Sequence, residues 1–405
     1  MTTIDVRTPS ADGRAGSGTY PTPARPDDAR FVGAATDIGV VASEHAPDHD
    51  RDATFVHEAY DAMRESGYLA LAVPEELGGA GATLRQLCYA QAELARHDGA
   101  TALAVTMHLY ITAMQAFRHR KGFADATAVL RRVADEGLVL ATSGGSDWLW
   151  PTTVAVEHGD VLRVTGRKAF CSQVPGASVL ATSAVVGEPG PDAEVVHFSL
   201  PLSSPGVRIV ETWDTLGMRG TASHDLVLED VEVPVERISG RRPYGQLAPP
   251  LLLAGIHFAP IGGACYLGIA CGARDVAVDG AMTGSKGPDA LGALPRVHRQ
   301  IGLMDAKLRC SWWALMGALD EIGDDFGPTP QTFSTVMLAK RQAVLDAIEV
   351  VDLAMDTLGG RSYFRRSPLE RAHRDVRAGT FHPQPPEVAL AYAGKLALGD
   401  PGVTE

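Results

Sequence analysis

The 405-residue chain is short of the residues and runs that mark metal-binding, disulfide-bonded or membrane-spanning proteins. It has only five cysteines, with no CxxC pair among them, which predicts reduced thiols in place of a disulfide framework or a zinc site, and no bound metal. No apolar run reaches the roughly 18–20 residues of a membrane helix. The N-terminus also lacks the basic stretch and apolar core of a secretory signal. These absences predict a cytoplasmic protein without a membrane partner.

Positive charge is scarce as well. Lys and Arg number 36 against 49 Asp and Glu, which gives a formal net charge of −13. Because nucleic acids and anionic membranes both require a basic surface, neither is expected as a partner. The sequence contains no P-loop and no HExxH, and its nearest approach to GxGxxG is Gly78-Gly79-Ala80-Gly81, which lacks the third glycine. A Rossmann dinucleotide site is therefore not expected.

Apolar periodicity divides the chain into a helical part, a strand-rich part and a second helical part. Residues 1–27 are rich in Gly, Ser, Thr, Pro and Asp without periodicity, which predicts a disordered tail. We expect an N-terminal helical domain over 28–134, a central β-barrel domain over 135–247 and a C-terminal helical bundle over 248–405.

Seven short runs in the central part have the composition of strands. They cover residues 138–142, 152–157, 162–169, 179–186, 195–200, 207–211 and 226–233. His158-Gly159-Asp160 has the sequence of a hairpin turn between two of them. Strands at this spacing, without helices between them, predict a small antiparallel barrel or sandwich and not a parallel sheet.

Four segments carry a resemblance to a known family. They are Pro74-Glu75-Glu76-Leu77-Gly78-Gly79, Leu216-Gly217-Met218-Arg219-Gly220-Thr221, Leu358-Gly359-Gly360 and the arginine-rich stretch that ends at His382. In the order helical, strand-rich, helical, they resemble the acyl-CoA dehydrogenase superfamily of flavoproteins. The resemblance implies an α+β fold with an N-terminal helical domain, a central antiparallel β-barrel and a C-terminal four-helix bundle. It also implies a homo-oligomer, a dimer or a tetramer, because the family shares its flavin site between subunits.

The base position departs from the main pattern of that family. Most members carry Tyr-Glu-Gly-Thr there, and the Glu removes the α-proton of an acyl thioester. Here the Tyr and Glu positions hold His382 and Pro383, and residues 251–263, the second place where the family keeps a carboxylate, contain no Asp or Glu. A His at this position resembles the flavin-dependent monooxygenase branch. A lone His is usually structural, but imidazole can take a proton near neutral pH, so we predict that His382 is a general base or proton shuttle.

The resemblance also implies a set of flavin contacts. Thr142 and Ser146 lie in a Gly/Ser loop, whose backbone N–H groups and hydroxyls could bond a flavin edge or a phosphate. Phe170 and Ser172 match the family positions beside the flavin ring, and an alternating strand would place both on one face. Ser172, near the flavin N5, is the second predicted catalytic residue. Simple turn and strand roles are the alternatives for these four residues.

Further site residues are predicted on the helices. Gly359 and Gly360 are expected to approach the flavin diphosphate from a neighbouring subunit, although Gly359 could simply end a helix. His108 and His257 are possible companions of His382 in a substrate pocket, and core positions are the alternative. The six arginines between residues 361 and 377 suggest a salt-bridge network, with one or two of them on a phosphate as the sharper option.

Together these features predict a flavin-dependent oxidoreductase. The favoured function is a two-component monooxygenase that takes reduced FMN or FAD from a separate flavin reductase and oxygenates a small organic substrate with O₂. One alternative is an FAD-dependent acyl-CoA dehydrogenase that has an unidentified base and passes electrons to an electron-transfer flavoprotein. A second alternative is an inactive flavin-binding homologue.

Overall fold

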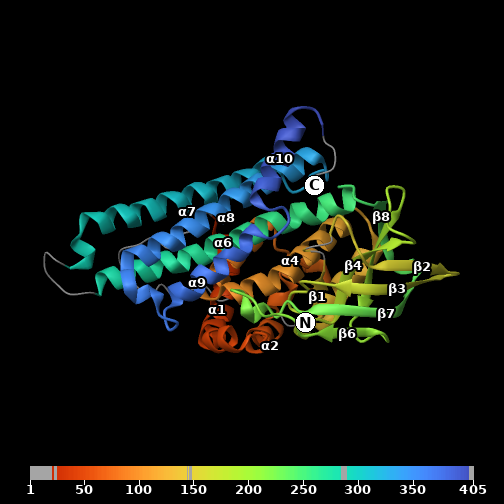
Figure 1. The fold of residues 1–405 in the computed structure, drawn as a ribbon, viewed down its shortest axis with the longest axis horizontal. Coiled ribbons are helices and arrows are strands. Elements are labelled where there is room, and N and C mark those ends of the chain that lie inside the picture. The colour runs from red at the N-terminus through yellow and green to blue at the C-terminus, as the bar shows by residue number, and fades with distance from the viewer. Residues whose placement is uncertain (1–20, 22–24, 144, 146–147, 284–289, 401–405) are drawn as a thin grey trace.

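The computed structural model describes residue 21 and residues 25–143, 145, 148–283 and 290–400 (Figure 1). The predicted tail over residues 1–27 therefore lies almost entirely outside the described residues. The first helix begins at Pro26, two residues before the predicted start of the helical part. Proline suits this position because the first N–H groups of a helix have no intrahelical acceptor.

Five α-helices precede the sheet: α1 Pro26–Asp52, α2 His57–Ser66, α3 Leu84–His97, α4 Gly99–Arg120 and α5 Ala124–Glu136. Two 3-10 turns, η1 Tyr68–Ala70 and η2 Glu75–Leu77, lie in the connection before α3, where the Pro and Gly residues predict a loop. Thr83 and Gln86 form a capping box at the start of α3, and the Asp98 side chain caps α4 by accepting a hydrogen bond from the Thr101 N–H. These caps fix the short connection between α3 and α4.

Eight strands follow: β1 Leu140–Thr142, β2 Val154–His158, β3 Val161–Lys168, β4 Val179–Val186, β5 Glu194–Pro201, β6 Val207–Val210, β7 Asp225–Pro234 and β8 Ile238–Pro243. The sheet order is β6-β7-β3-β2-β4-β5-β8, and β1 pairs with β4. Gly159, at a φ of 65°, turns the predicted β2–β3 hairpin. The sequence missed β8, and the expectation of antiparallel pairing alone is wrong, because β4 pairs parallel with both β1 and β2.

The C-terminal part is a bundle of long helices, as predicted. It contains α6 Pro249–Met282, α7 Pro295–Ile322, α8 Pro330–Leu358, α9 Pro368–Val376 and α10 Pro386–Ala397, with turns η7 Gly359–Tyr363 and η8 Arg377–Thr380 on either side of α9. In Figure 1, α6, α7 and α8 run side by side along the long axis, and the strands gather at one end of them. The described structure thus has the predicted α+β architecture; whether its three parts fold as separate domains stays a prediction.

Glycines on α6 allow that helix to lie against the N-terminal helices. A Cβ added at Gly268 would be 2.2 Å from the carbonyl oxygen of Ala92, and one at Gly272 would be 2.4 Å from that of Arg96. Since a side chain has no room at either position, only glycine permits this approach of α6 to α3. The same contact buries α6 between α3 and α8.

Two helices contain apolar windows long enough to cross a membrane, which the sequence analysis did not detect. They are α4 and α6, with mean hydropathies of 1.2 and 1.5 over 18 residues. In each, 83% of that window is buried inside the fold. Burial of this extent is typical of core helices that are apolar on all sides.

Candidate active site

A buried lysine holds the segment that carries His382. Lys340, on α8, is 1% exposed, and its Nζ donates hydrogen bonds to the carbonyl oxygens of His382 at 2.9 Å, Pro383 at 3.2 Å and Gln384 at 3.0 Å. Burial lowers the pKa of Lys340 to about 7. Because an ammonium group has three N–H donors, three carbonyl acceptors satisfy all of them. The main chain between η8 and α10 is therefore fixed to α8.

The His382 ring is held by α6. The Tyr266 hydroxyl is 2.8 Å from His382 Nδ1, and Phe258 meets the imidazole edge-on with ring centroids 5.9 Å apart. Burial and the nearby Lys340 ammonium lower the pKa of His382 to about 3. The imidazole is therefore neutral at physiological pH. Its Nε2 has no hydrogen-bond partner among the residues that the structure describes.

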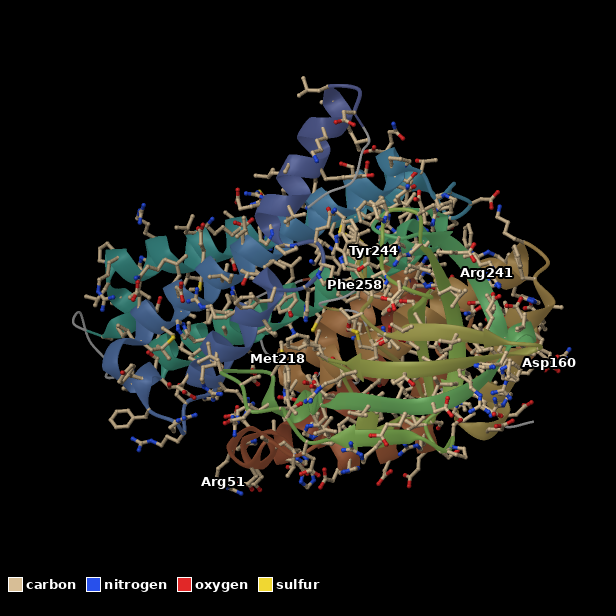
Figure 2. The ribbon with its side chains drawn as sticks, turned by 45° about the vertical axis from the view of Figure 1, so that its right-hand side comes forward. Arg51, Asp160, Met218, Arg241, Tyr244 and Phe258 are labelled. Atoms are coloured by element: carbon tan, nitrogen blue, oxygen red, sulfur yellow. The ribbon has the colours of Figure 1, made fainter. Side chains whose placement is uncertain are left out.

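Aromatic side chains connect His382 with the end of β1. Phe258 packs edge-on against Tyr110 of α4 with centroids 5.5 Å apart, and the Thr142 side chain lies near enough to the Tyr110 hydroxyl to offset part of the rise that burial causes in its pKa. Figure 2 shows Phe258 in the middle of the molecule, between the helices and the strands. A row of neighbouring side chains thus connects two predicted site residues, Thr142 and His382, although they are far apart in the sequence.

Phe170 lies beyond the end of β3, and not within a strand as predicted. Its φ is 56°, in the left-handed region, so Phe170 and Ser172 do not project from one strand face by alternation. Phe170 is 51% exposed and meets Trp213 edge-on at 6.0 Å. A Cβ added at Gly145 would lie 3.6 Å from the Phe170 Cβ, so Gly145 lies next to this side chain.

A chain of hydroxyl groups begins at Ser172. Its Oγ is 2.8 Å from Ser223 Oγ, which is 2.7 Å from Thr221 Oγ1, and Thr221 donates to the carbonyl oxygen of Met218. That carbonyl also accepts a hydrogen bond from the indole of Trp213. The network therefore fixes Ser172 and the Phe170–Trp213 pair relative to the Leu216–Thr221 motif, of which Met218 is labelled in Figure 2.

These residues fit a flavin ring. An exposed aromatic side chain in a fixed backbone conformation offers an apolar wall, and the hydroxyls of Thr142 and Ser172 are partners for a polar ring edge. Within the described ranges, no three His, Cys, Asp or Glu residues form a group that could hold a metal ion.

Comparison with known sequences agrees with this geometry. Residues 39–120, 142–231 and 261–385 match the families described as "Acyl-CoA dehydrogenase, N-terminal domain", "middle domain" and "C-terminal domain". The chain belongs to the acyl-CoA dehydrogenase family. It is a flavin-dependent enzyme, as its relatives are.

Two relatives of this chain have names that indicate different activities. The chain is 30% identical to the putative acyl-CoA dehydrogenase YdbM of Bacillus subtilis, over 85% of this chain and 91% of the relative. It is also 30% identical to the amino sugar nitrososynthase DnmZ of Streptomyces peucetius, over 87% of this chain and 89% of that protein.

A solved structure shares the fold. KijD3, in complex with FMN and dTDP-3-amino-2,3,6-trideoxy-4-keto-3-methyl-D-glucose, superposes with a TM-score of 0.83, covering 94% of this chain and 95% of KijD3 at 24% sequence identity. At that identity the likeness shows the acyl-CoA dehydrogenase fold and nothing finer.

Of the remaining predicted flavin contacts, Gly359 and Gly360 lie far from Phe258. Ser146 lies outside the described residues. Gly359 and Gly360 are exposed just past the end of α8, where Leu358 packs against Gly280 near the end of α6. Phe258 is 22 residues before Gly280 on the same helix, which places the two glycines about 33 Å from Phe258 at 1.5 Å per residue. A shared flavin site therefore requires a second subunit, and the contact of these glycines with flavin stays a prediction.

His108 and His257 both have structural contacts. His108 is fully buried, and its ring nitrogens lie 2.7 Å from the carbonyl oxygen of Leu69 and 3.1 Å from the Leu140 N–H. His257 Nδ1 is 2.8 Å from the carbonyl oxygen of Leu253, and its ring packs against both Phe117 and Phe326. Neither contacts His382 in these pairings, so the described contacts favour core roles; a substrate contact of either ring stays a prediction.

No acidic side chain takes the place of the family's catalytic Glu among the described contacts of His382. Glu387, the nearest carboxylate beyond it in the sequence, is 87% exposed and lies 3.8 Å from Arg341. Asp375 is buried, but its carboxyl group accepts a hydrogen bond from the Met218 N–H and makes no described contact with His382. The carboxylate that a dehydrogenase mechanism needs is thus absent from the described segment around His382.

Sequence reasoning missed Tyr266, Lys340 and Tyr110. Lys340 had a detectable signal, since it falls in step with Met337 and Val344 on the buried face of α8. A lysine at such a position is rarely buried unless its ammonium group has hydrogen-bond or charge partners. Tyr266 and Tyr110 had no comparable signal, because aromatic residues are ordinary in buried helices.

Proposed function

We propose that this protein is the oxygenase component of a two-component flavin monooxygenase. It would take reduced FMN or FAD from a separate flavin reductase and transfer one oxygen atom of O₂ to a small organic substrate. The observation that carries this proposal is the base position itself. A neutral His382, fixed by Tyr266 and Lys340, stands directly before Pro383, which occupies the position where a dehydrogenase needs a carboxylate.

The relatives support an amine as the oxygenated group. DnmZ is named for forming a nitroso group on an amino sugar, and KijD3 was solved with FMN and a dTDP-linked amino sugar. Oxidation of a primary amine to a hydroxylamine consumes one O₂ and two electrons from reduced flavin and releases one water. A second such step gives the nitroso product and releases two waters. An amino sugar carried by a nucleoside diphosphate is therefore the substrate class that we favour.

Each residue of the site has a defined part in this proposal. Flavin supplies the electrons and activates O₂. Phe170 and the hydroxyls of Thr142 and Ser172 would hold the ring, and the packed side chains of Tyr110 and Phe258 would help to exclude water from it. His382 faces the reacting group with its free Nε2. Exclusion of water from such a site limits the unproductive loss of the oxidising equivalent.

The test uses the purified full chain with anaerobically reduced FMN and a dTDP-linked 3-amino sugar. On admission of O₂, we expect a product heavier by one oxygen atom. The control contains reduced FMN and the same sugar without the protein. An acyl-CoA dehydrogenase activity, which the similarity to YdbM favours, is tested in parallel with a dye-coupled assay over short to long acyl-CoA esters. Robust dye reduction with any ester, without oxygen transfer to an amine, would overturn the monooxygenase proposal.

A further inference from the structure

The Tyr266 hydroxyl has one partner, and this decides the direction of its hydrogen bond. Tyr266 is 0% exposed, and burial raises its pKa well above the ordinary value, so the hydroxyl keeps its proton. A buried O–H requires an acceptor. Among the described residues, the only one within hydrogen-bonding distance is His382 Nδ1, at 2.8 Å. The hydroxyl therefore donates, and Nδ1 accepts.

The tautomer of His382 follows from this direction. A neutral imidazole carries its single proton on one nitrogen, so a ring that accepts at Nδ1 is protonated at Nε2. The groups that face the ring keep it neutral: Tyr266 and Phe258 from α6 are uncharged, and the Lys340 ammonium from α8 repels a second proton. The free ring nitrogen is thus an N–H donor.

We propose that Tyr266 is a positioning residue that holds His382 in the Nε2–H tautomer, so that His382 serves as a hydrogen-bond donor to an oxygen acceptor on the bound ligand. This role replaces the general base that the sequence suggests. The acceptor is a carbonyl, ether or hydroxyl oxygen. Its assignment to the substrate rests on the proposed function, whereas the tautomer itself does not.

Lys340 has a complementary part in this arrangement. It fixes the main chain of His382 from α8 while Tyr266 fixes the ring from α6. Proton transfer away from Nε2 would require Nδ1 to take the Tyr266 proton and leave a buried tyrosinate, which the burial of Tyr266 opposes. His382 is therefore expected to donate a hydrogen bond from Nε2 without transferring the proton.

The first test reads the tautomer directly by NMR of protein labelled with ¹⁵N in its histidine rings. The His382 signals are identified by their loss in His382→Asn. We expect a bare Nδ1, a protonated Nε2 and no titration between about pH 5 and 8, where an ordinary His changes charge. A protonated Nδ1, or titration within that window, overturns the proposal even if no substrate is known.

The second test compares Tyr266→Phe with Tyr392→Phe, which removes a hydroxyl from another buried tyrosine of the bundle. Tyr266→Phe should give a mixture of both tautomers, lower oxygenation by roughly three- to tenfold, the usual worth of one hydrogen bond, and leave FMN affinity within about twofold. Tyr392→Phe should change neither the tautomer nor the rate. An unchanged tautomer in folded Tyr266→Phe overturns the proposal; if that variant does not fold, the wild-type spectrum decides.

The third test separates donor from base. In His382→Gln the side-chain amide reaches the place of the imidazole Nε2–H and keeps a donor, so oxygenation should stay within about tenfold of wild type, whereas His382→Ala should lose more. A base role predicts that both variants lose roughly 10²- to 10⁴-fold. If wild type binds no flavin or oxygenates nothing, the proposed function fails, while the spectrum still confirms or overturns the tautomer.

Discussion

Asp375 is the buried acidic residue whose charge state matters most for stability. Its carboxyl group accepts a hydrogen bond from the Met218 N–H, while burial, together with Asp98 and Asp50, raises its pKa to about 7. The native state therefore keeps a proton that the unfolded chain loses near pH 4. It follows that the contribution of Asp375 to stability falls as pH rises from about 4 to 7 and stays low above pH 7.

We predict that Asp375→Asn stabilises the protein in alkaline solution. The amide oxygen can still accept from Met218 but carries no charge, so the free energy of unfolding should rise on the order of 2 kcal/mol near pH 8 and change little near pH 4. Denaturant unfolding at the two pH values measures the difference, with the exposed Asp192→Asn as the control. Equal effects at both pH values would show that Asp375 is ionised throughout.

At the scale of elements, α9 is held against the rest of the fold by ion pairs and by a close backbone contact at one glycine. Arg374 pairs with Asp50 of α1 at 2.6 Å and with Glu370 at 2.8 Å, and it donates to the Leu216 carbonyl oxygen. Arg371 and Arg377 have acidic partners as well. The arginine-rich segment therefore contains the predicted salt-bridge network, which fixes α9 against α1 and the Leu216–Thr221 motif.

Gly217 is the position where that motif touches α9. An added Cβ would lie 2.4 Å from the Arg374 carbonyl carbon, and a backbone atom cannot give way as a flexible side chain can. We predict that Gly217→Ala destabilises the protein by about 1–3 kcal/mol, the usual cost of overpacking. Gly317→Ala in α7 is the control, since its Cβ meets nothing within 4 Å and should stabilise by about 0.5–1 kcal/mol. Equal thermal unfolding temperatures for the two variants would contradict this close approach.

At the scale of the whole molecule, the predicted flavin contacts lie at two ends of the bundle. If Gly359 and Gly360 contact flavin, they do so on the neighbouring subunit, so binding depends on assembly. Gly360 is exposed, and an added Cβ meets nothing within 4 Å of its own chain. A large side chain there should be tolerated by the isolated fold.

We therefore predict that Gly360→Tyr lowers FMN affinity at least tenfold without lowering the thermal unfolding temperature of flavin-free protein. Fluorescence titration measures the affinity, and sedimentation reports the oligomer. Gly302→Tyr, on an exposed face of α7 with equally open space, serves as the control. Unchanged affinity in Gly360→Tyr would place the flavin contact of the second subunit elsewhere.

Local patterns were sufficient for much of the fold. Apolar periodicity predicted helical parts on either side of the strands, strand-like composition predicted β4 at its observed limits, and the His158-Gly159-Asp160 turn predicted the β2–β3 hairpin. The replacement of the catalytic Glu by Pro383 was also evident, because proline has no ionisable group. Each of these features depends on residues close in sequence, so the chain alone determines it.

Contacts between distant residues were decided only by the tertiary structure. The sequence placed His382 near the flavin as a base, but its tautomer depends on Tyr266, which is 116 residues away, and its main chain depends on Lys340. Likewise, no local pattern showed the parallel pairing of β4 with β1 and β2 or the left-handed backbone of Phe170. Periodicity shows which face of an element is buried, but not which residues pack against that face. The chemistry of this site depends on those packing partners.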